Sequence, residues 1–302
     1  MLDLTRRRLC LGGAALGLLG SEAMAQPAQT AQTAMPTVQL PDGTRVPALG
    51  QGSWHLAQGR HPVAEEEEAL RTGITLGLTL IDTAEIYGGG RAEQMIAKVI
   101  AGQRDKVFVV SKVRPDHATA SGMPQACAAS LARLGTDYLD LYLLHWRTGA
   151  TDLATVVGSF EKLRAEGRIR RWGVSNFEVP DMEDLFRVHG GERCSTNQVR
   201  YNLQDRRIER DLLPWCDRHG LPIMAYSPLG QGDLLRNAAL VRVAERHQSN
   251  PAAIALAWTI RSGRAISIPE SGSPTHVQQN AAALSLRLTD ADLSELDRGF
   301  AT

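Results

Sequence analysis

Four side chains of this 302-residue sequence could together protonate an oxygen atom, and each of them ends or follows a short apolar run. They are a carboxylate, a phenol, an ammonium and an imidazole: Asp82, Tyr87, Lys112 and His145. Runs rich in Val, Ile, Leu and aromatic residues are typical of strands buried on both faces, as in parallel sheets. Because parallel α/β proteins build their active sites at the carboxyl ends of their strands, we expect the four side chains to meet there.

The chemistry of this set is specific to proton transfer. A tyrosine phenol has a pKa of about 10, and an ammonium within about 4–6 Å would lower the pKa of Tyr87 by favouring the phenolate. The carboxylate of Asp82 would hold Lys112 charged and in place, and the imidazole of His145 could orient a substrate oxygen. The set therefore predicts protonation of an oxygen that gains negative charge, which happens when a carbonyl receives hydride.

Seven short segments carry further information: GQGSW at 50–54, IDTAEIYG at 81–88, VSKV at 110–113, DLYLLHW at 140–146, WGVSNF at 172–177, TNQV at 196–199 and AYSPLG at 225–230. In these segments and their order the sequence resembles the aldo-keto reductase superfamily, over about residues 37–299. The resemblance implies an α/β fold, a (β/α)8 TIM barrel with an N-terminal β-hairpin closing the barrel bottom. It also implies an NAD(P)H-dependent oxidoreductase that reduces aldehydes or ketones to alcohols, with Tyr87 as the general acid.

The pattern of the chain agrees with such a barrel. With 43% hydrophobic residues the chain can bury a sizeable core, and one barrel of this kind needs about 250 residues. Residues 37–47 predict a hairpin that turns at Asp42 and Gly43. The run of four glutamates at 65–68 predicts the solvated first turn of a helix. Strands are predicted at or near 49, 79–81, 107–111, 139–144, 171–174, 196–198, 222–225 and 265–268, and amphipathic helices between them, two at 124–134 and 153–166.

By the same resemblance, residues after the later strands would hold a nicotinamide cofactor. The hydroxyl and amide side chains of Ser175, Asn176 and Gln198 can match the acceptor and donors of a carboxamide, although Ser and Asn are also common helix caps. The resemblance alone implies an aromatic ring stacked on the nicotinamide and a set of backbone amides around the pyrophosphate. These are Tyr226 for the stacking and Ser227, Leu229 and Gly230 for the pyrophosphate.

The segment after the eighth strand departs from the family's pattern. Relatives typically carry a lysine and an arginine around the adenosine 2′-phosphate, where this sequence has Glu270 and His276. A carboxylate repels a dianionic phosphate but can accept from a ribose 2′-hydroxyl, as acidic residues do in NAD sites. Ser271, Ser273 and a protonated His276 could still hold the phosphate, and Asn280 completes the family's cofactor residues. The cofactor is therefore NADPH or NADH, and the sequence leaves the preference open.

The substrate pocket is predicted to be small and apolar. We expect Trp54 and Trp146, on the loops after the first and fourth barrel strands, to form its walls. Arg147 follows Trp146 in the chain and could bind an acidic substrate, so this alternative stays open. The expected partner is a small-molecule carbonyl compound.

Two alternatives to a carbonyl reductase remain. One is a nucleotide-retaining, redox-sensing or regulatory barrel without turnover, and the other is a periplasmic sugar or alcohol dehydrogenase that runs in the oxidative direction. The complete set of proton-transfer residues argues against the first, because a pure binding module gains nothing from a tuned phenol.

The amino terminus predicts export. Residues 1–25 place paired arginines, Arg6 and Arg7, before a short apolar stretch and end on Ala-Met-Ala, which resembles a twin-arginine-type signal peptide. Residues 26–36 predict a flexible lead-in, followed by the barrel at 37–302. We therefore expect a periplasmic protein that meets the twin-arginine export machinery. The apolar stretch is too short for stable membrane insertion.

Composition argues against other classes of partner. The 33 basic and 33 acidic residues give no net charge, so nothing indicates nucleic acid, and we expect a monomer. No histidine or cysteine spacing indicates a metal site. Cleavage of the signal would leave Cys127, Cys194 and Cys216, of which at least one stays unpaired; a Cys194–Cys216 disulfide remains open.

Overall fold

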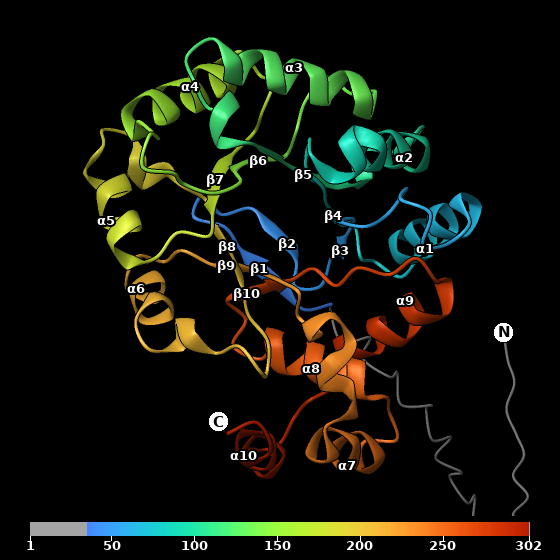
Figure 1. Ribbon diagram of the computed structural model, residues 1–302. Helices are drawn as coiled ribbons and strands as arrows, with labels where there is room; N and C mark the ends of the chain where they lie inside the picture. Colours follow the sequence, from blue (N-terminus) through green and yellow to red (C-terminus); the bar gives the residue numbers. More distant parts are fainter. Residues whose placement is uncertain (1–34, 302) are drawn as a thin grey trace, which may run out of the picture. The chain divides into compact units, whose positions relative to one another are not determined.

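Eight parallel strands form a barrel with helices around it (Figure 1). The computed structural model describes residues 35–301. Consecutive strands pair in parallel, and the first meets the last because Gly50 N–H donates to Ser267 O (2.8 Å) and Gly52 N–H to Pro269 O (2.9 Å). The barrel strands are β3 Gln51–Gly52, β4 Leu80–Asp82, β5 Phe108–Val113, β6 Leu141–Leu144, β7 Trp172–Ser175, β8 Asn197–Arg200, β9 Ile223–Tyr226 and β10 Ala265–Ser267.

Helices cover the outside of the barrel (Figure 1). Several of them begin at residues that suit a helix start. Asp152 and Asn237 accept from backbone N–H groups in the first turns of α4 and α7, and Thr289 and Asp292 form the capping box of α10. The helices are α1 Val63–Thr75, α2 Arg91–Ile100, α3 Gly122–Leu134, α4 Leu153–Ala165, α5 Val179–Arg187, α6 Leu212–Arg218, α7 Ala238–Arg246, α8 Pro251–Ile260, α9 Pro274–Ala281 and α10 Asp290–Gly299.

A hairpin of β1 (Thr37–Gln39) and β2 (Arg45–Pro47) closes one end of the barrel. Its turn contains Gly43 at φ 87°, in the left-handed region that favours glycine. The buried side chains of the hairpin share one hydrophobic cluster with residues near the amino ends of the barrel strands. This cluster includes Val38, Leu40 and Val46 from the hairpin and Leu80, Val110, Leu141, Met224 and Ile266 from the barrel.

Alternation along the strands sorts the barrel interior into layers. Side chains two positions apart point to the same face of a strand. Asp82 therefore points to the same face as Leu80, two positions earlier in β4, and Lys112 points to the same face as Val110, two positions earlier in β5. Because Leu80 and Val110 pack against the hairpin, the polar side chains lie above an apolar layer, at the carboxyl end of the barrel.

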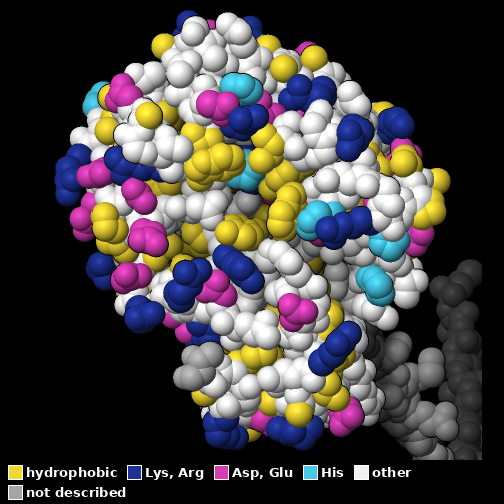
Figure 2. All heavy atoms as spheres, in the orientation of Figure 1, with side chains coloured by type: hydrophobic (Ala, Val, Ile, Leu, Met, Phe, Trp, Pro, Cys, Tyr) yellow, Lys and Arg dark blue, Asp and Glu magenta, His cyan; other side chains and the backbone are white. Residues whose placement is uncertain are grey.

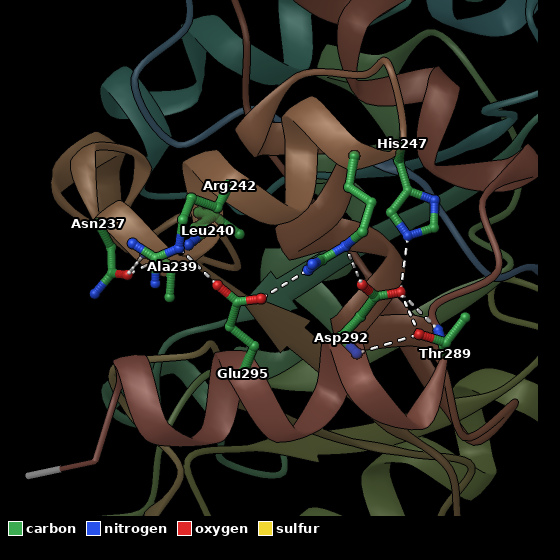
Figure 3. Close-up of polar contacts among 9 residues, drawn as sticks. Asn237, Ala239, Leu240, Arg242, His247, Thr289, Asp292 and Glu295 are labelled. Carbon is green, nitrogen blue, oxygen red and sulfur yellow. Dashed lines mark hydrogen bonds and ion pairs between the residues drawn. The ribbon is translucent and has the colours of Figure 1, made fainter.

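A network of ion pairs joins α10 to α7 and the residue that follows it (Figure 3). Asp292 is buried and lies 3.0 Å from Arg246 Nε and 2.8 Å from His247 Nε2. Glu295 accepts from Arg242 and Arg246, each at 2.7 Å. Burial by itself would raise the pKa of Asp292, but hydrogen bonds, the first from His247, lower it to about 2. The network therefore fixes the last helix against the barrel's outer layer.

Replacing Asp292 with Asn should destabilise the protein by a margin that depends on pH. The folded-state pKa of about 2 lies below the ordinary value of 3.8. The carboxylate therefore contributes fully above about pH 5, and its contribution is lost as the pH falls through roughly 4 to 2. The shift corresponds to about 2 kcal/mol. Urea unfolding of both proteins across this range should show the stability gap shrinking toward acid, and a constant gap would contradict the assignment.

The predicted barrel and hairpin are confirmed, with strand positions shifted by at most a few residues. The predicted signal peptide at 1–25 and nearly all of the lead-in at 26–36 lie outside the described residues. Within residues 35–301, no helix combines the length and apolarity needed to cross a membrane. In the same range, no group of three or more His, Cys, Asp or Glu side chains is arranged to hold a metal ion.

The three cysteines of the barrel are buried thiols. Cys127, Cys194 and Cys216 are all unpaired, so the disulfide left open for Cys194 and Cys216 is not formed. Burial raises the pKa of each thiol to about 12. They are therefore protonated at neutral pH and act as small apolar side chains of the core.

Candidate active site

The four residues predicted to transfer a proton converge at the carboxyl ends of adjacent strands. Asp82 ends β4, Lys112 lies near the end of β5, and His145 directly follows β6. Tyr87 begins a short 3₁₀ helix, Tyr87–Gly90, on the loop after β4. Because β4, β5 and β6 are neighbours in the barrel, residues far apart in the sequence face one another.

Lys112 is completely buried and is the centre of the cluster. Its ammonium donates to Asp82 Oδ1 at 2.6 Å, to Thr83 O at 2.9 Å and to Tyr87 Oη at 3.1 Å. An ammonium has three N–H donors, so each has a partner. Burial disfavours the charged form, but the Asp82 carboxylate and the Tyr87 phenol outweigh it and raise the pKa of Lys112. Lys112 is therefore charged at neutral pH.

Asp82 has a partner for each of its oxygens. One accepts from Lys112, and the other accepts from Gln198 Nε2 at 2.7 Å. Burial raises the pKa of Asp82, while Lys112 and Gln198 offset part of that increase. Gln198, predicted to face a carboxamide, thus also binds the cluster around Lys112.

The pKa of Tyr87 differs from the prediction. Burial raises it, Lys112 lowers it only in part, and the Asp82 carboxylate raises it again. The prediction that Lys112 brings the pKa of Tyr87 below its ordinary value is therefore wrong, because the sequence does not show how deeply the phenol is buried. A protonated phenol is the form that a general acid requires, and an ammonium at this distance can stabilise a phenolate.

His145 is a neutral imidazole. Burial, and then the charge of Lys112, lowers the pKa of His145 to about 3. Its ring lies edge-on to that of Tyr87, with centroids 5.8 Å apart. Its Nδ1 atom is buried without a hydrogen-bond partner among residues 35–301. A neutral imidazole offers one donor and one acceptor, so His145 can hydrogen-bond an oxygen without adding charge.

Two of the side chains predicted to hold a carboxamide, Ser175 and Asn176, lie at the end of β7, next to Tyr226 at the end of β9. Asn176 Nδ2 donates to His145 O and to Ser175 Oγ, both at 3.1 Å, and Asn176 Oδ1 accepts from Tyr226 Oη at 2.9 Å. Asn176 has φ 61°, a left-handed conformation that is uncommon outside glycine. Such conformations persist where the surrounding structure fixes them, and they cluster at ligand sites.

A second left-handed turn follows β9, at the predicted pyrophosphate residues. Ser227 has φ 48°, Gly230 φ 54° and Gln231 φ 58°. Asn202 Nδ2 donates to Ser227 O at 2.9 Å and fixes the turn. Backbone that mixes right- and left-handed conformations can point successive N–H groups at an anion. The Gly230 N–H already donates to Ser227 O within the turn, at 3.0 Å, so the binding of a pyrophosphate by Ser227, Leu229 and Gly230 stays a prediction.

A cavity of about 300 Å³ adjoins this turn and is lined by four of the predicted cofactor residues, Leu229, Ser271, His276 and Asn280, but not by Ser273. Glu66 also lines it; the side chain is buried, and Oε1 has no partner among residues 35–301. An orphaned buried acceptor fits a ligand that brings donors, such as the ribose hydroxyls or the amine of adenosine. The residues present therefore fit the adenosine half of a nicotinamide dinucleotide.

Glu270 lines the same cavity, but its carboxylate is engaged. Oε2 accepts from His55 N–H at 2.7 Å, and Oε1 lies 3.1 Å from His55 Nδ1. The Glu270 carboxylate therefore binds the protein and does not point freely at a phosphate or a ribose hydroxyl, as the sequence had suggested. Glu270 fastens the loop after β3 to the loop after β10.

Three residues of the cavity were missed in the sequence. Arg60 and His61 come just before α1, and Glu66 lies in its first turn. The prediction of a solvated glutamate run is wrong for Glu66, which is fully buried and accepts from Ala57 N–H at 2.7 Å. Only the barrel topology could have indicated these cavity residues, since a closed barrel brings the loop after its first strand beside the loop after its last.

The two predicted pocket tryptophans lie on the loops after β3 and β6. Trp54 is 47% exposed and Trp146 is 36% exposed, and the Trp146 ring packs on His145 with centroids 4.9 Å apart. Figure 2 shows hydrophobic side chains gathered around a hollow in the middle of one face. The Arg147 guanidinium binds two carboxylates of α5 at 2.7 and 2.8 Å. It is therefore not available to an acidic substrate in this conformation.

Comparison with solved structures finds the same fold in proteins of similar sequence. An aldo/keto reductase from Klebsiella pneumoniae in complex with NADP and acetate matches with a TM-score of 0.85 and 47% identity, over 88% of this chain and 95% of that one. A Klebsiella pneumoniae aldo-keto reductase in complex with NADPH matches with a TM-score of 0.85 and 48% identity over the same shares.

Sequence comparison gives the same answer. The chain is 47% identical over 268 residues to the methylglyoxal reductase YeaE of Escherichia coli strain K12, covering 87% of this chain and 94% of that protein. It is 33% identical over 261 residues to the glyoxal reductase of Bacillus subtilis strain 168, covering 86% and 91%. Residues 48–299 match the model of the aldo/keto reductase family. The chain belongs to the aldo/keto reductase family.

Proposed function

We propose that the protein is an NADPH-dependent reductase of small aldehydes and ketones, with 2-oxoaldehydes such as methylglyoxal as its substrate class. The observation that carries the proposal is the buried Lys112, which binds both Asp82 and Tyr87. The relatives named methylglyoxal reductase and glyoxal reductase support the substrate class. The Klebsiella pneumoniae structures with NADP and NADPH support the cofactor.

In this mechanism the cofactor, when bound, supplies hydride to the carbonyl carbon. Neutral His145 hydrogen-bonds the carbonyl oxygen and directs it toward Tyr87. Tyr87 gives its proton to that oxygen as negative charge develops there. Lys112, 3.1 Å from the phenol oxygen, stabilises the phenolate, and Asp82 holds Lys112 in position. Each step uses a group whose charge state follows from its burial and neighbours.

The cofactor residues divide by the part of the dinucleotide that they would hold. The side chains at the ends of β7 and β8 would bind the carboxamide, and the ring of Tyr226 would stack on the nicotinamide. The turn after β9 would bind the pyrophosphate, and the 300 Å³ cavity would take the adenosine.

An assay of the purified protein tests the proposal. Methylglyoxal and glyoxal should each cause consumption of NADPH in proportion to the alcohol formed. The decrease in NADPH absorbance measures this consumption. Calorimetry on the same preparation would measure nucleotide binding independently. Tight nucleotide binding without turnover of these or of simple aliphatic aldehydes would overturn the reductase and favour the regulatory barrel.

We also propose export by the twin-arginine route, on the strength of the amino-terminal sequence. Replacing both Arg6 and Arg7 with Lys should leave the protein folded and active but retained in the cytoplasm. Charge is conserved, so a general secretory signal should tolerate the change, whereas a receptor that reads paired arginines should not. Cell fractionation with immunodetection measures the outcome, with Arg8→Lys as the matched control. Normal periplasmic accumulation of the double variant would reject the route.

A further inference from the structure

The loop between β3 and α1 brings positive charge to the 300 Å³ cavity. Arg60 and His61 line the cavity from this loop, and His276 lines it from α9. Across residues 35–301, no hydrogen bond or ion pair engages the side chain of Arg60 or His276, and His61 Nδ1 approaches only Glu65, at 4.0 Å. The cavity therefore holds a guanidinium and two imidazoles whose side chains make no hydrogen bond to the protein, beside the carboxylates of Glu66 and Glu270.

Two carboxylates hold this loop in place. Glu270 accepts from His55 N–H at 2.7 Å, and Glu66 accepts from Ala57 N–H at 2.7 Å. Arg91 Nε also donates to Ala57 O at 3.0 Å. Ala57 has φ 60°, a left-handed conformation that a non-glycine residue keeps only when its contacts fix it. The loop is thus anchored at its start and its middle, close to Arg60.

A glycine makes room for the loop on the opposite wall. A Cβ atom at Gly272 would lie 2.5 Å from His61 Cδ2 and 3.3 Å from Glu66 Cγ. The imidazole of His61 therefore packs directly against the backbone of the loop after β10. Any larger side chain at position 272 would push His61 away from that loop.

Building on the proposed use of NADPH, we propose that Arg60, assisted by His61 and His276, binds the 2′-phosphate of the cofactor. Glu270 is then a positioning residue that holds the loop of Arg60 across the cavity. A guanidinium suits this task because it forms charged, bidentate hydrogen bonds with phosphate. The cation comes from the first loop of the barrel, which accounts for a carboxylate at position 270, where a lysine is otherwise expected.

Two substitutions separate the positioning effect of Glu270 from its charge. Glu270→Gln keeps an acceptor for His55 N–H and removes the charge, whereas Glu270→Ala removes both. We expect Glu270→Ala to weaken NADP⁺ binding about tenfold, as one lost charged hydrogen bond would, and Glu270→Gln to stay within about threefold of wild type. Equal tightening by both variants would show that Glu270 acts by repulsion alone and would overturn its positioning role.

Gly272→Val tests the packing of His61. It should weaken binding of NADP⁺ more than binding of NAD⁺, because the displaced imidazole faces the 2′-phosphate. Combined with His61→Ala, which removes the clash and the imidazole together, Gly272→Val should add no further loss. If the losses in NADP⁺ affinity from the two substitutions were additive, Gly272→Val would act through a residue other than His61.

The decisive measurement uses fragments of the cofactor. Calorimetry would give dissociation constants for NADP⁺, NAD⁺, adenosine 2′,5′-bisphosphate and AMP with wild type, Arg60→Ala and Arg187→Ala, the last being an arginine of α5 whose side chain is 70% exposed. Arg60→Ala should weaken the two 2′-phosphorylated ligands about 10–100-fold and the other two less than about twofold. This loss should diminish with added salt, and Arg187→Ala should change nothing.

The outcomes distinguish this inference from the proposed function. A wild type that binds neither NADP⁺ nor NAD⁺ would contradict the proposed function itself. Normal NADP⁺ binding by wild type, together with unchanged 2′-phosphate affinity in Arg60→Ala, would overturn the inference alone.

Discussion

Tyr87→Phe should abolish carbonyl reduction and leave cofactor binding nearly intact. The substitution removes only the hydroxyl that supplies the proton, and loss of a general acid typically costs about 10²–10⁴ in rate. The ring itself keeps its place, since it packs edge-on to His145 and lies 4.8 Å from Lys112 Nζ. The kcat for NADPH-dependent reduction of methylglyoxal measures the loss, and quenching of tryptophan fluorescence measures NADP⁺ affinity.

Tyr138→Phe provides the matched control for this variant. It also removes one phenol hydroxyl, but the Tyr138 ring stacks between Arg104 and Arg170, at 4.1 and 4.5 Å, just before β6 begins. That end of the strand is opposite the cluster around Lys112, so its kcat should equal that of wild type. Near wild-type kcat in Tyr87→Phe would remove Tyr87 from the mechanism.

The barrel and the cluster of four residues could be predicted because their signals are local. Apolar runs define the strands, and the period of two along a strand decides which side chains point inward. Asp82 and Lys112 each stand two positions after an inward apolar residue, so their place at the carboxyl end follows from the sequence. Parallel pairing of β4 with β5 then brings them together without further information.

The adenosine cavity could not be predicted in the same way, because its contacts join distant parts of the chain. Glu270 and His55 are 215 positions apart and meet only because β10 closes against β3. Glu66 was assigned to a solvated surface because charge runs usually are solvated, and only the packed barrel shows it buried. A resemblance to relatives also says little here, since it marks position 270 as unusual without naming its partner.

The charge states of the cluster were likewise beyond the sequence. The direction of the Tyr87 pKa depends on the balance between burial and the Lys112 ammonium, and burial is a property of the whole fold. The sequence identified which groups interact but not which effect is larger. The balance between burial and the Lys112 ammonium also determines the effect expected from replacing Lys112.

Lys112→Met should cost both activity and stability. It leaves the Asp82 carboxylate buried without its ammonium partner, and breaking a buried ion pair in this way typically costs about 3–5 kcal/mol. Burial already raises the pKa of Asp82, and loss of Lys112 raises it further. A carboxyl group with a raised folded-state pKa binds more protons when folded, so the variant should lose stability as the pH rises from about 4 toward 7. Urea unfolding across that range measures this dependence.

The double variant Asp82→Asn, Lys112→Met separates the two consequences. Removing both charges leaves no unpaired buried ion, and replacing a buried pair by neutral groups is often close to neutral for stability. Stability should therefore return, and the extra loss with rising pH caused by the unpaired Asp82 should disappear, because a neutral asparagine side chain at position 82 can still hydrogen-bond Gln198, which binds Asp82 at 2.7 Å in the wild type. The kcat should stay as low as in Lys112→Met, because no ammonium remains beside Tyr87 to stabilise the phenolate. If restored stability brought back the activity, the lysine would serve folding rather than proton transfer, and the mechanism would need another group beside the phenol.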